Sequence, residues 1–285
     1  MANANAGYRG IARVEGGNYI RCTNMNVNLQ QDTLFYDHTL GLNDYVSSGD
    51  STKIERPGFV QTQKNFWRPS PLSIGGSIAY PLTAEEDGYN LFQKAKTGAG
   101  VGNIEMYYYC DDDSGSNGRS FEECRVGSFQ LNITAGDFAN IQVDFGGKRS
   151  VDISGTPTHY KAPTKMISWD KVSISGSGLS ENIQAFSMNI NNNLSHVYTA
   201  RPSSIAPYEP KDVRLGMQEV TGTISVYNKK GPINVINGGK VELTLSVGNW
   251  STPLFVILKT VQLEARVGPF VTTIPFIGVE RPFGS

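Results

Sequence analysis

The feature that most constrains this chain is a β-rich pattern that occurs twice. Met25-Asn-Val-Asn28 recurs as Met188-Asn-Ile-Asn191. Both segments alternate apolar and polar residues, which is the period of a strand with one buried face. A repeated segment of this kind favours a chain built from two similar units.

Two further matches follow in the same order. Ile74–Ile78 resembles Val220–Ile224, each with a central glycine, and Phe129–Phe138 resembles Val261–Phe270. The separation between matched residues falls from the first match to the third, as expected if the second copy has shorter loops. We therefore interpret the sequence as a duplication.

The boundary between the copies is expected where breaker residues gather. Ser154–Thr158 and Lys161–Thr164 are rich in Gly, Pro, Ser and Thr. This places the first domain at 1–155 and the second at 165–285. The length of 285 residues fits either one large β domain or two of ordinary size.

Each copy is expected to contain the same strands in the same order. An opening strand, the asparagine-containing strand, a long polar segment and the glycine-containing strand precede a closing hairpin. The opening strands are expected at Ile11–Val14 and Lys171–Ser175, and the closing turns at Ala135–Asp137 and Val267–Pro269.

A helix is expected in the first copy alone. Thr83–Glu86 matches a capping box, with Thr83 as the cap, and Gly98 is placed to end the helix. The matching segment of the second copy, residues 228–240, contains several glycines and a proline, which favours a turn or hairpin.

The long polar segments, Gln30–Pro69 (the first arm) and Asn192–Gly216 (the second arm), lack clear elements of their own. Each could be a surface loop packed on its own domain, or could dock onto another subunit. Both carry residues suited to docking: Phe35, Tyr36 and Leu40 in the first, and Arg201, Ile205 and Tyr208 in the second.

Charge and hydropathy exclude several classes of protein. The net charge is -1 and only 18% of residues are charged, so nothing favours nucleic-acid binding or attachment to a membrane surface. Leu254–Leu258 is the longest apolar stretch and is far too short to span a bilayer. The N-terminal residues have no signal-peptide pattern.

Catalytic and cofactor motifs are not found. The three histidines lack metal-ligand spacing, Cys110–Asp113 departs from a calcium loop, and Gly98–Gly102 lacks the Lys of a phosphate loop. We expect no metal, no cofactor and no enzymatic activity, although a distant carboxylate pair stays open. Cys110 and Cys124 could pair, or all cysteines could be free thiols in a reducing cytoplasm.

A family resemblance rests on the second copy. Ile183–Leu194, Arg201-Pro202 and Glu219–Val226 together resemble the major tail tube proteins of long-tailed bacteriophages, most clearly over 165–285. The resemblance implies β-sandwich-like units that form a barrel together. The expected fold is therefore mainly β: two tandem tail-tube-like β-sandwich domains, with one flanking helix in the first.

The resemblance also implies an assembly. Units would join edge to edge into rings, with a continuous β-barrel as the inner wall, and rings would stack into a hollow tube for DNA passage. Two units per chain imply a trimeric, pseudo-hexameric ring; if only the second half is a tube domain, six whole chains form the ring. The chain would lie in the virion tail, assemble in the host cytoplasm and contact other tail proteins.

Site residues follow from this resemblance. One face of the asparagine-containing strands would meet the core and the other the lumen, which predicts as lumen residues Asn26, Asn28, Asn189 and Asn191. A neutral or acidic lining would let DNA slide, because a basic one would bind phosphates. The arms would contact neighbouring subunits or rings.

Two other readings stay open. The chain could be another virion or contractile-system component, such as a tail terminator, an inner tube or a decoration protein. It could also be a carbohydrate-binding β-sandwich module, with Tyr107–Tyr109 and the tryptophans as stacking platforms.

Overall fold

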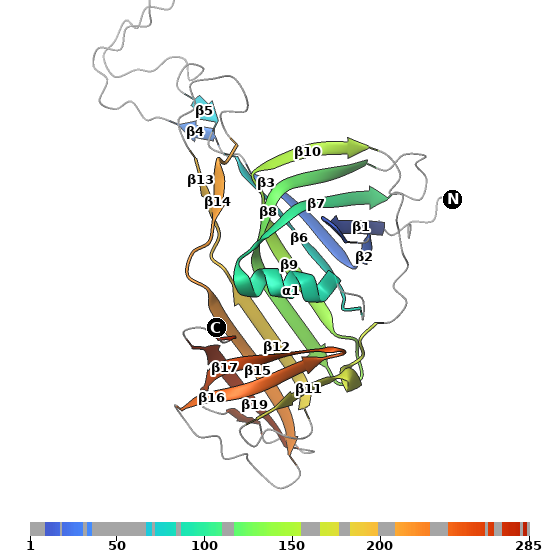
Figure 1. The fold of residues 1–285 in the computed structure, drawn as a ribbon, viewed down its shortest axis with the longest axis vertical. Coiled ribbons are helices and arrows are strands. Elements are labelled where there is room, and N and C mark those ends of the chain that lie inside the picture. Colours follow the sequence, from blue (N-terminus) through green and yellow to red (C-terminus); the bar gives the residue numbers. More distant parts are fainter. Residues whose placement is uncertain are drawn as a thin grey trace, which may run out of the picture.

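In the computed structural model, most of the described residues lie in β-strands, and one α-helix is described (Figure 1). The predicted mainly-β fold is confirmed. The described residues are 9–17, 19–30, 33–35, 67–69, 72–83, 87–109, 117–154, 166–176, 183–198, 209–228, 239–259, 262–264, 270–279 and 282–283.

The elements follow the alternation of apolar and polar residues along the sequence. Those of the first half are β1 (Arg9–Val14), β2 (Ile20–Cys22), β3 (Asn24–Gln30), β4 (Thr33–Phe35), β5 (Trp67–Pro69), β6 (Ser73–Pro81), α1 (Asp87–Thr97), β7 (Gly100–Tyr109), β8 (Asn117–Thr134), β9 (Asn140–Gly146) and β10 (Arg149–Ser154). Those of the second half are a 3-10 turn (Trp169–Lys171), β11 (Val172–Ser175), β12 (Ile183–Asn191), β13 (Ser195–Val197), β14 (Asp212–Arg214), β15 (Glu219–Asn228), β16 (Lys240–Val247), β17 (Trp250–Leu258), β18 (Gln262–Glu264) and β19 (Phe270–Gly278).

One antiparallel sheet runs through both halves. Its central part, here called the central sheet, has the strand order β3-β6-β9-β8-β12-β15-β19-β18. The first four strands come from the first half and the last four from the second. The pairing of β8 with β12 is therefore the joint between the halves.

Most strand pairings of the first half recur in the second. The matching pairs are β1–β7 and β11–β16, β3–β6 and β12–β15, β4–β5 and β13–β14, β6–β9 and β15–β19, and β7–β8 and β16–β17. The long strand β8 corresponds to β17 and β18 together, because both of these pair with β19 as β8 pairs with β9.

The register of the pairings shows which residues correspond. Each half has a row of three facing residues, an aliphatic residue, a glycine and a phenylalanine, namely Val27–Gly76–Phe145 and Met188–Gly222–Phe276. The glycine-containing matches of the sequence therefore coincide in the structure. Met188 corresponds to Val27, however, so the sequence match of Met188 with Met25 is displaced by two residues.

The predicted helix is present, as α1, described from Asp87 onward. Thr83 is buried and forms an isolated β-bridge with Met166, but residues 84–86 lie outside the described residues, so the predicted capping box stays a prediction. The helix ends as predicted at Gly98, whose φ of +69° is the left-handed conformation common after a helix. An added Cβ at Gly88 would lie 2.1 Å from Cδ1 of Leu82, so the buried Leu82 side chain would have to move.

A single hydrophobic cluster extends through both halves. The ring of Phe92 in α1 stacks on Trp250 at a centroid distance of 4.9 Å and meets Phe129 edge-on at 5.6 Å. Because Phe129 lies in β8 and Trp250 in β17, the helix packs against both halves. The division into domains 1–155 and 165–285 stays a prediction.

Candidate functional site

The asparagines predicted to face the lumen lie on the side of the central sheet opposite the core. In β3, Asn26 and Asn28 are exposed, whereas the alternate residues Met25, Val27 and Leu29 pack against the core. The side-chain alternation that the sequence predicts is thus present in the first copy.

The second copy alternates in the same way. Met188 and Ile190 are buried, whereas Asn189 and Asn191 are half-buried on the other face. Asn191 also has a local role, because its Oδ1 accepts a hydrogen bond from N–H of Asn193 over 2.9 Å. Asn193 has a φ of +47°, which asparagine tolerates better than most residues.

Amides and hydroxyls dominate this face, here called the polar face. Beside the asparagines it carries Ser77, Ser128, Gln130, Asn132, Gln142, Ser187, Thr221, Thr223, Ser225 and Thr273. Ser187 and Thr223 hydrogen-bond across strands over 2.8 Å. Asp144 and Glu219, both acidic, also lie on this face.

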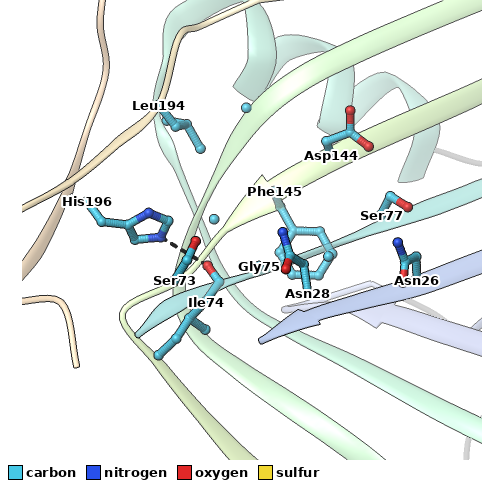
Figure 2. Close-up of a pocket in the computed structure, with 13 residues that line it drawn as sticks. Asn26, Asn28, Ser73, Ile74, Gly75, Ser77, Asp144, Phe145, Leu194 and His196 are labelled. Atoms are coloured by element: carbon cyan, nitrogen blue, oxygen red, sulfur yellow. Dashed lines mark hydrogen bonds between the residues drawn. The ribbon is translucent and has the colours of Figure 1, made fainter. Parts of the chain in front are cut away.

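The polar face has two depressions. Figure 2 shows Asn26, Asn28, Ser77 and Asp144 around the first, with His196 of the second arm at its rim. The second lies around Asn189, between Gln130 and Thr221. Among the described residues, Oδ1 of Asn189 is buried without a hydrogen-bond partner. A polar ligand, such as water, could bind there.

Both ends of the second arm are tied to the C-terminus of α1. The buried Asn192 donates from Nδ2 to the carbonyls of Ala95 and Val126, each over 3.0 Å. Gln218 donates from Nε2 to the carbonyls of Ala95 and Lys96, over 3.0 and 3.1 Å. The last carbonyls of a helix lack partners within it, so these amides satisfy them.

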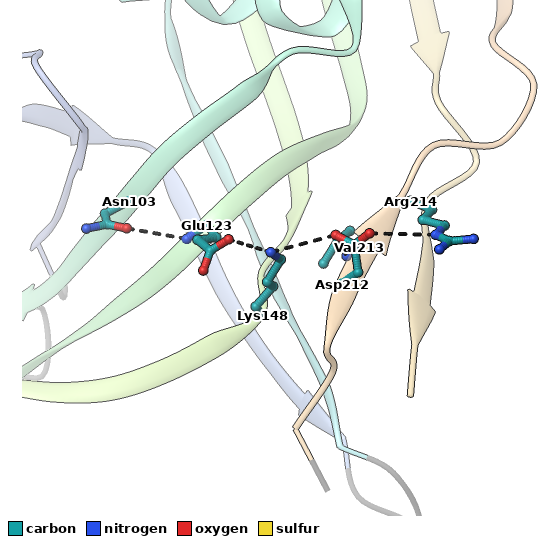
Figure 3. A network of polar contacts seen from close by, with 6 residues as sticks. All are labelled: Asn103, Glu123, Lys148, Asp212, Val213 and Arg214. Atoms are coloured by element: carbon teal, nitrogen blue, oxygen red, sulfur yellow. Dashed lines mark hydrogen bonds and ion pairs between the residues drawn. The ribbon is translucent and has the colours of Figure 1, made fainter. Parts of the chain in front are cut away.

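A chain of polar contacts fixes β14 to the first half (Figure 3). Nζ of Lys148 lies between the carboxylates of Glu123 and Asp212, 3.7 Å from the latter. Arg214 lies 3.6 Å from the other oxygen of Asp212. Desolvation opposes ionisation of Asp212, but a hydrogen bond from N–H of Val213 and the nearby cations outweigh it and lower its pKa.

The second arm also contacts the start of β6, just after the first arm. A ring nitrogen of His196 lies 3.0 Å from the carbonyl oxygen of Ile74, and the hydroxyl of Tyr198 donates to the carbonyl of Leu72 over 3.0 Å. Figure 1 shows the hairpins β4–β5 and β13–β14 at the same end of the molecule. Both arms therefore leave one end of the central sheet.

Most predicted arm contacts lie outside the described residues. Phe35 is described in backbone only, where it pairs with Trp67. The others outside the described ranges are Tyr36, Leu40, Arg201, Ile205 and Tyr208. The role of these six residues stays a prediction.

The central sheet has two open edges. Among the described residues, β3 pairs with β6 alone and β18 with β19 alone. Unpaired N–H and C=O groups at such edges are available to a further strand.

Several other expectations bear on the aromatic and reactive groups. Tyr107 is buried against Tyr19, and Trp250 is buried in the core, so neither can be a sugar-stacking platform. Cys124 is a free thiol whose pKa burial raises to about 12, whereas Cys110 lies outside the described residues.

The described ranges contain neither a cluster of metal ligands nor a membrane-spanning helix. In these ranges, no three or more His, Cys, Asp or Glu side chains gather as a metal site. None of the helical segments described has the length and apolar character needed to cross a membrane.

The comparison with protein families decides the broader identity. A family model for phage tail tube proteins matches residues 49–280. The chain belongs to this family. No curated protein sequence matches it. The family match confirms the resemblance inferred from the sequence. Phage tail tube proteins are structural components of the virion tail, and they assemble with themselves and with other tail proteins.

Sequence reasoning missed the bonds that hold the second arm of this tail tube protein. The asparagine run Asn191–Asn193 drew attention as part of a family motif, yet Asn192 proves to be the buried member that binds α1. Gln218 has no pattern around it that would have indicated the same role.

Proposed function

We propose that this chain is the tube-forming subunit of a phage tail, with three chains in each ring and two similar units in each chain. Stacked rings would form the hollow tube through which DNA leaves the virion. The observation that carries this proposal is the β8–β12 joint, which connects two sets of strands with the same pairings edge to edge.

The repeated pairings support three chains over six. If the second half alone were a tube domain, the first half would have no reason to repeat its pairings and its glycine–phenylalanine row. A ring of three chains would contain six similar units, and joining each β18 to the next β3 would leave no open edge in the central sheet.

The polar face is proposed as the wall of the lumen. The hydrophobic core occupies the other side of the central sheet, so the polar face is the one left for water and DNA. Its asparagines, glutamines, serines and threonines can contact DNA without strong attraction, and Asp144 and Glu219 repel phosphates. DNA could then move along the tube without being held.

The arms are proposed as the contacts between neighbouring subunits or rings. Both leave one end of the central sheet, and the anchors at Asn192, Gln218 and Lys148 hold the second arm in a defined direction. Assembly would take place in the host cytoplasm, together with the other tail proteins.

Electron microscopy of the purified chain tests the proposal. We expect hollow tubes whose rings have threefold symmetry and contain three chains of 31.1 kDa each, as counted by native mass spectrometry. Rings of six chains would contradict the two-unit arrangement, and a chain that stays monomeric at high concentration would contradict tube formation. Deleting residues 36–52 of the first arm should leave folded protein without tubes.

A further inference from the structure

The core-facing side chains of the edge strand β3 are less buried than those of its counterpart β12. Met25, Val27 and Leu29 are partly exposed, although they pack against the core. The residues that correspond to them in β12 are exposed by 2%, 1% and 0%, respectively: Phe186, Met188 and Ile190. The difference is that β12 has a neighbour on both sides, whereas β3 pairs with β6 alone among the described strands.

The neighbour that β12 has is β8, and the register of that joint is known. The facing pairs at its centre are Gln130 with Asn189, Leu131 with Met188, and Asn132 with Ser187. The leucine and methionine face the core, and the polar pairs lie on the polar face. The joint inside the chain therefore matches apolar with apolar and polar with polar residues.

The open strand β18 corresponds to the joining part of β8. In the first half, Gln130 lies opposite Gln142, and Gln142 precedes Phe145 by three residues. In the second half, Gln262 lies opposite Thr273, and Thr273 precedes Phe276 by three residues. Since Phe145 and Phe276 occupy the same place beside their glycines, Gln262 corresponds to Gln130. The next two residues, Leu263 and Glu264, correspond to Leu131 and Asn132.

We infer that β18 of one chain pairs antiparallel with β3 of the next, in the register of the joint inside the chain. The inference rests on the proposed ring and specifies the residues that meet in it. The expected facing pairs between chains are Gln262 with Asn28, Leu263 with Val27, and Glu264 with Asn26.

The chemistry of these pairs fits the two faces of the sheet. Leu263 would cover Val27, which is partly exposed in the single chain. Gln262 and Asn28 would extend the row of amides on the polar face, and Glu264 would add an acidic group next to Asn26. The strand that pairs with the open edge of β3 thus comes from a second copy of this chain.

Cysteine cross-linking in assembled tubes tests the register. Directly facing residues have Cβ atoms about 4.5–5.5 Å apart, so a thiol cross-linker of about 5 Å joins them and not residues four positions away. In the variant Asn28→Cys with Gln262→Cys, we expect covalent links between chains up to a closed trimer. Asn26→Cys with Glu264→Cys provides a second, independent pair.

Two controls accompany these variants. Gln130→Cys with Asn189→Cys tests the chemistry at the known joint, and its product should keep the mass of one chain. Asn24→Cys with Gln262→Cys is displaced by four residues in β3 and should give no links. Single-cysteine variants measure any contribution from the native thiols.

The outcomes separate the register from the proposed function. Tubes that form normally but link through the displaced pair, or through neither expected pair, overturn the register and leave the tube function standing. Failure of the unmodified chain to form rings or tubes would count against the proposed function and against this joint with it. Links from both expected pairs, with none from the displaced pair, support the inference.

Discussion

Gln218 donates a hydrogen bond from its side-chain amide to Oδ1 of Asn192 over 2.9 Å, at the C-terminal end of α1. The two residues flank the second arm, 26 positions apart in sequence. Through them, a helix of the first half is capped by the second half. The arm therefore leaves the sheet from a base that is fixed by hydrogen bonds on both sides.

Replacing Asn192 should weaken the whole fold. In Asn192→Ala, the buried carbonyl of Val126 loses a donor, whereas the amide of Gln218 keeps the carbonyls of Ala95 and Lys96 as acceptors. A buried polar group left unsatisfied costs about 1–3 kcal/mol, so we expect the free energy of unfolding to fall by about this amount, measured by urea denaturation of unassembled chains. Asn24→Ala, at an exposed position, should change it by less than about 0.5 kcal/mol.

A double-mutant cycle would isolate the bond between the two amides. The effects of Asn192→Ala and Gln218→Ala should not add, because both remove parts of one network; the coupling is expected at about 0.5–3 kcal/mol. Additive effects would show that the two residues act independently on α1.

Gly222 should not tolerate even a methyl group. A Cβ there would lie 2.2 Å from the carbonyl oxygen of Ser187 and 2.3 Å from the ring of Phe276. The first atom is backbone, so Gly222→Ala must displace β12 or β15, and overpacking of this kind costs about 1–3 kcal/mol. Thermal unfolding should show the loss as a lower melting temperature.

Gly100 provides the matched control for this substitution. Its added Cβ would meet only the carbonyl oxygen of Cys124, at 3.9 Å. Gly100→Ala should therefore leave the melting temperature unchanged or raise it slightly, because alanine restricts the unfolded chain. Equal losses at both positions would contradict the steric explanation.

The row that contains Gly222 also shows how far sequence reasoning reaches. Strand existence, the repeat and the polar–apolar alternation could be predicted, because each depends on residues close in sequence. The correspondence of Met188 with Met25 was displaced, because a pattern of period two matches almost as well after a shift of two residues. Only pairing with Gly76 and Gly222 distinguishes Val27 from Met25.

The helix and its anchors illustrate a second limit. Thr83 has the sequence signature of a cap, and nothing near it in sequence indicates that it also forms a bridge with Met166, which lies far along the chain. The bond from Asn192 to Ala95 joins residues 97 positions apart, so no local pattern could have indicated it. Contacts of this range decide which groups satisfy the last carbonyls of α1.

The contacts of Asp212 should give the second arm a pH dependence. Because the pKa of Asp212 is lower in the folded chain than its ordinary value of 3.8, ionised Asp212 stabilises the fold above that value. This contribution is lost as the pH falls through the lowered pKa. Asp212→Asn should thus reduce stability at pH 7 and show a smaller loss than the unmodified chain on acidification to pH about 2.

Denaturation at a series of pH values, at constant ionic strength, would measure this difference. Asp152→Asn is a suitable comparison, because Asp152 also has an ion-pair partner, Arg119, but lies away from the arm. If Asp212→Asn and the unmodified chain lose stability in parallel between pH 5 and pH 2, Asp212 has no such role.

A cation placed on the polar face should slow DNA passage if that face lines the lumen. Thr221 is exposed there, opposite Asn189 and away from both open edges, so Thr221→Lys should leave ring formation intact. Each lysine that engages a phosphate should steepen the salt dependence of DNA retention by about one unit of log–log slope. Phages with this variant should eject DNA more slowly at low salt and at the normal rate at high salt.

Thr221→Glu is the matched control. Phages with it should eject DNA at the normal rate at both salt concentrations, since glutamate only adds to the acidic character that Asp144 and Glu219 already give. Equal ejection by the lysine and glutamate variants at low salt would place the polar face away from the path of the DNA.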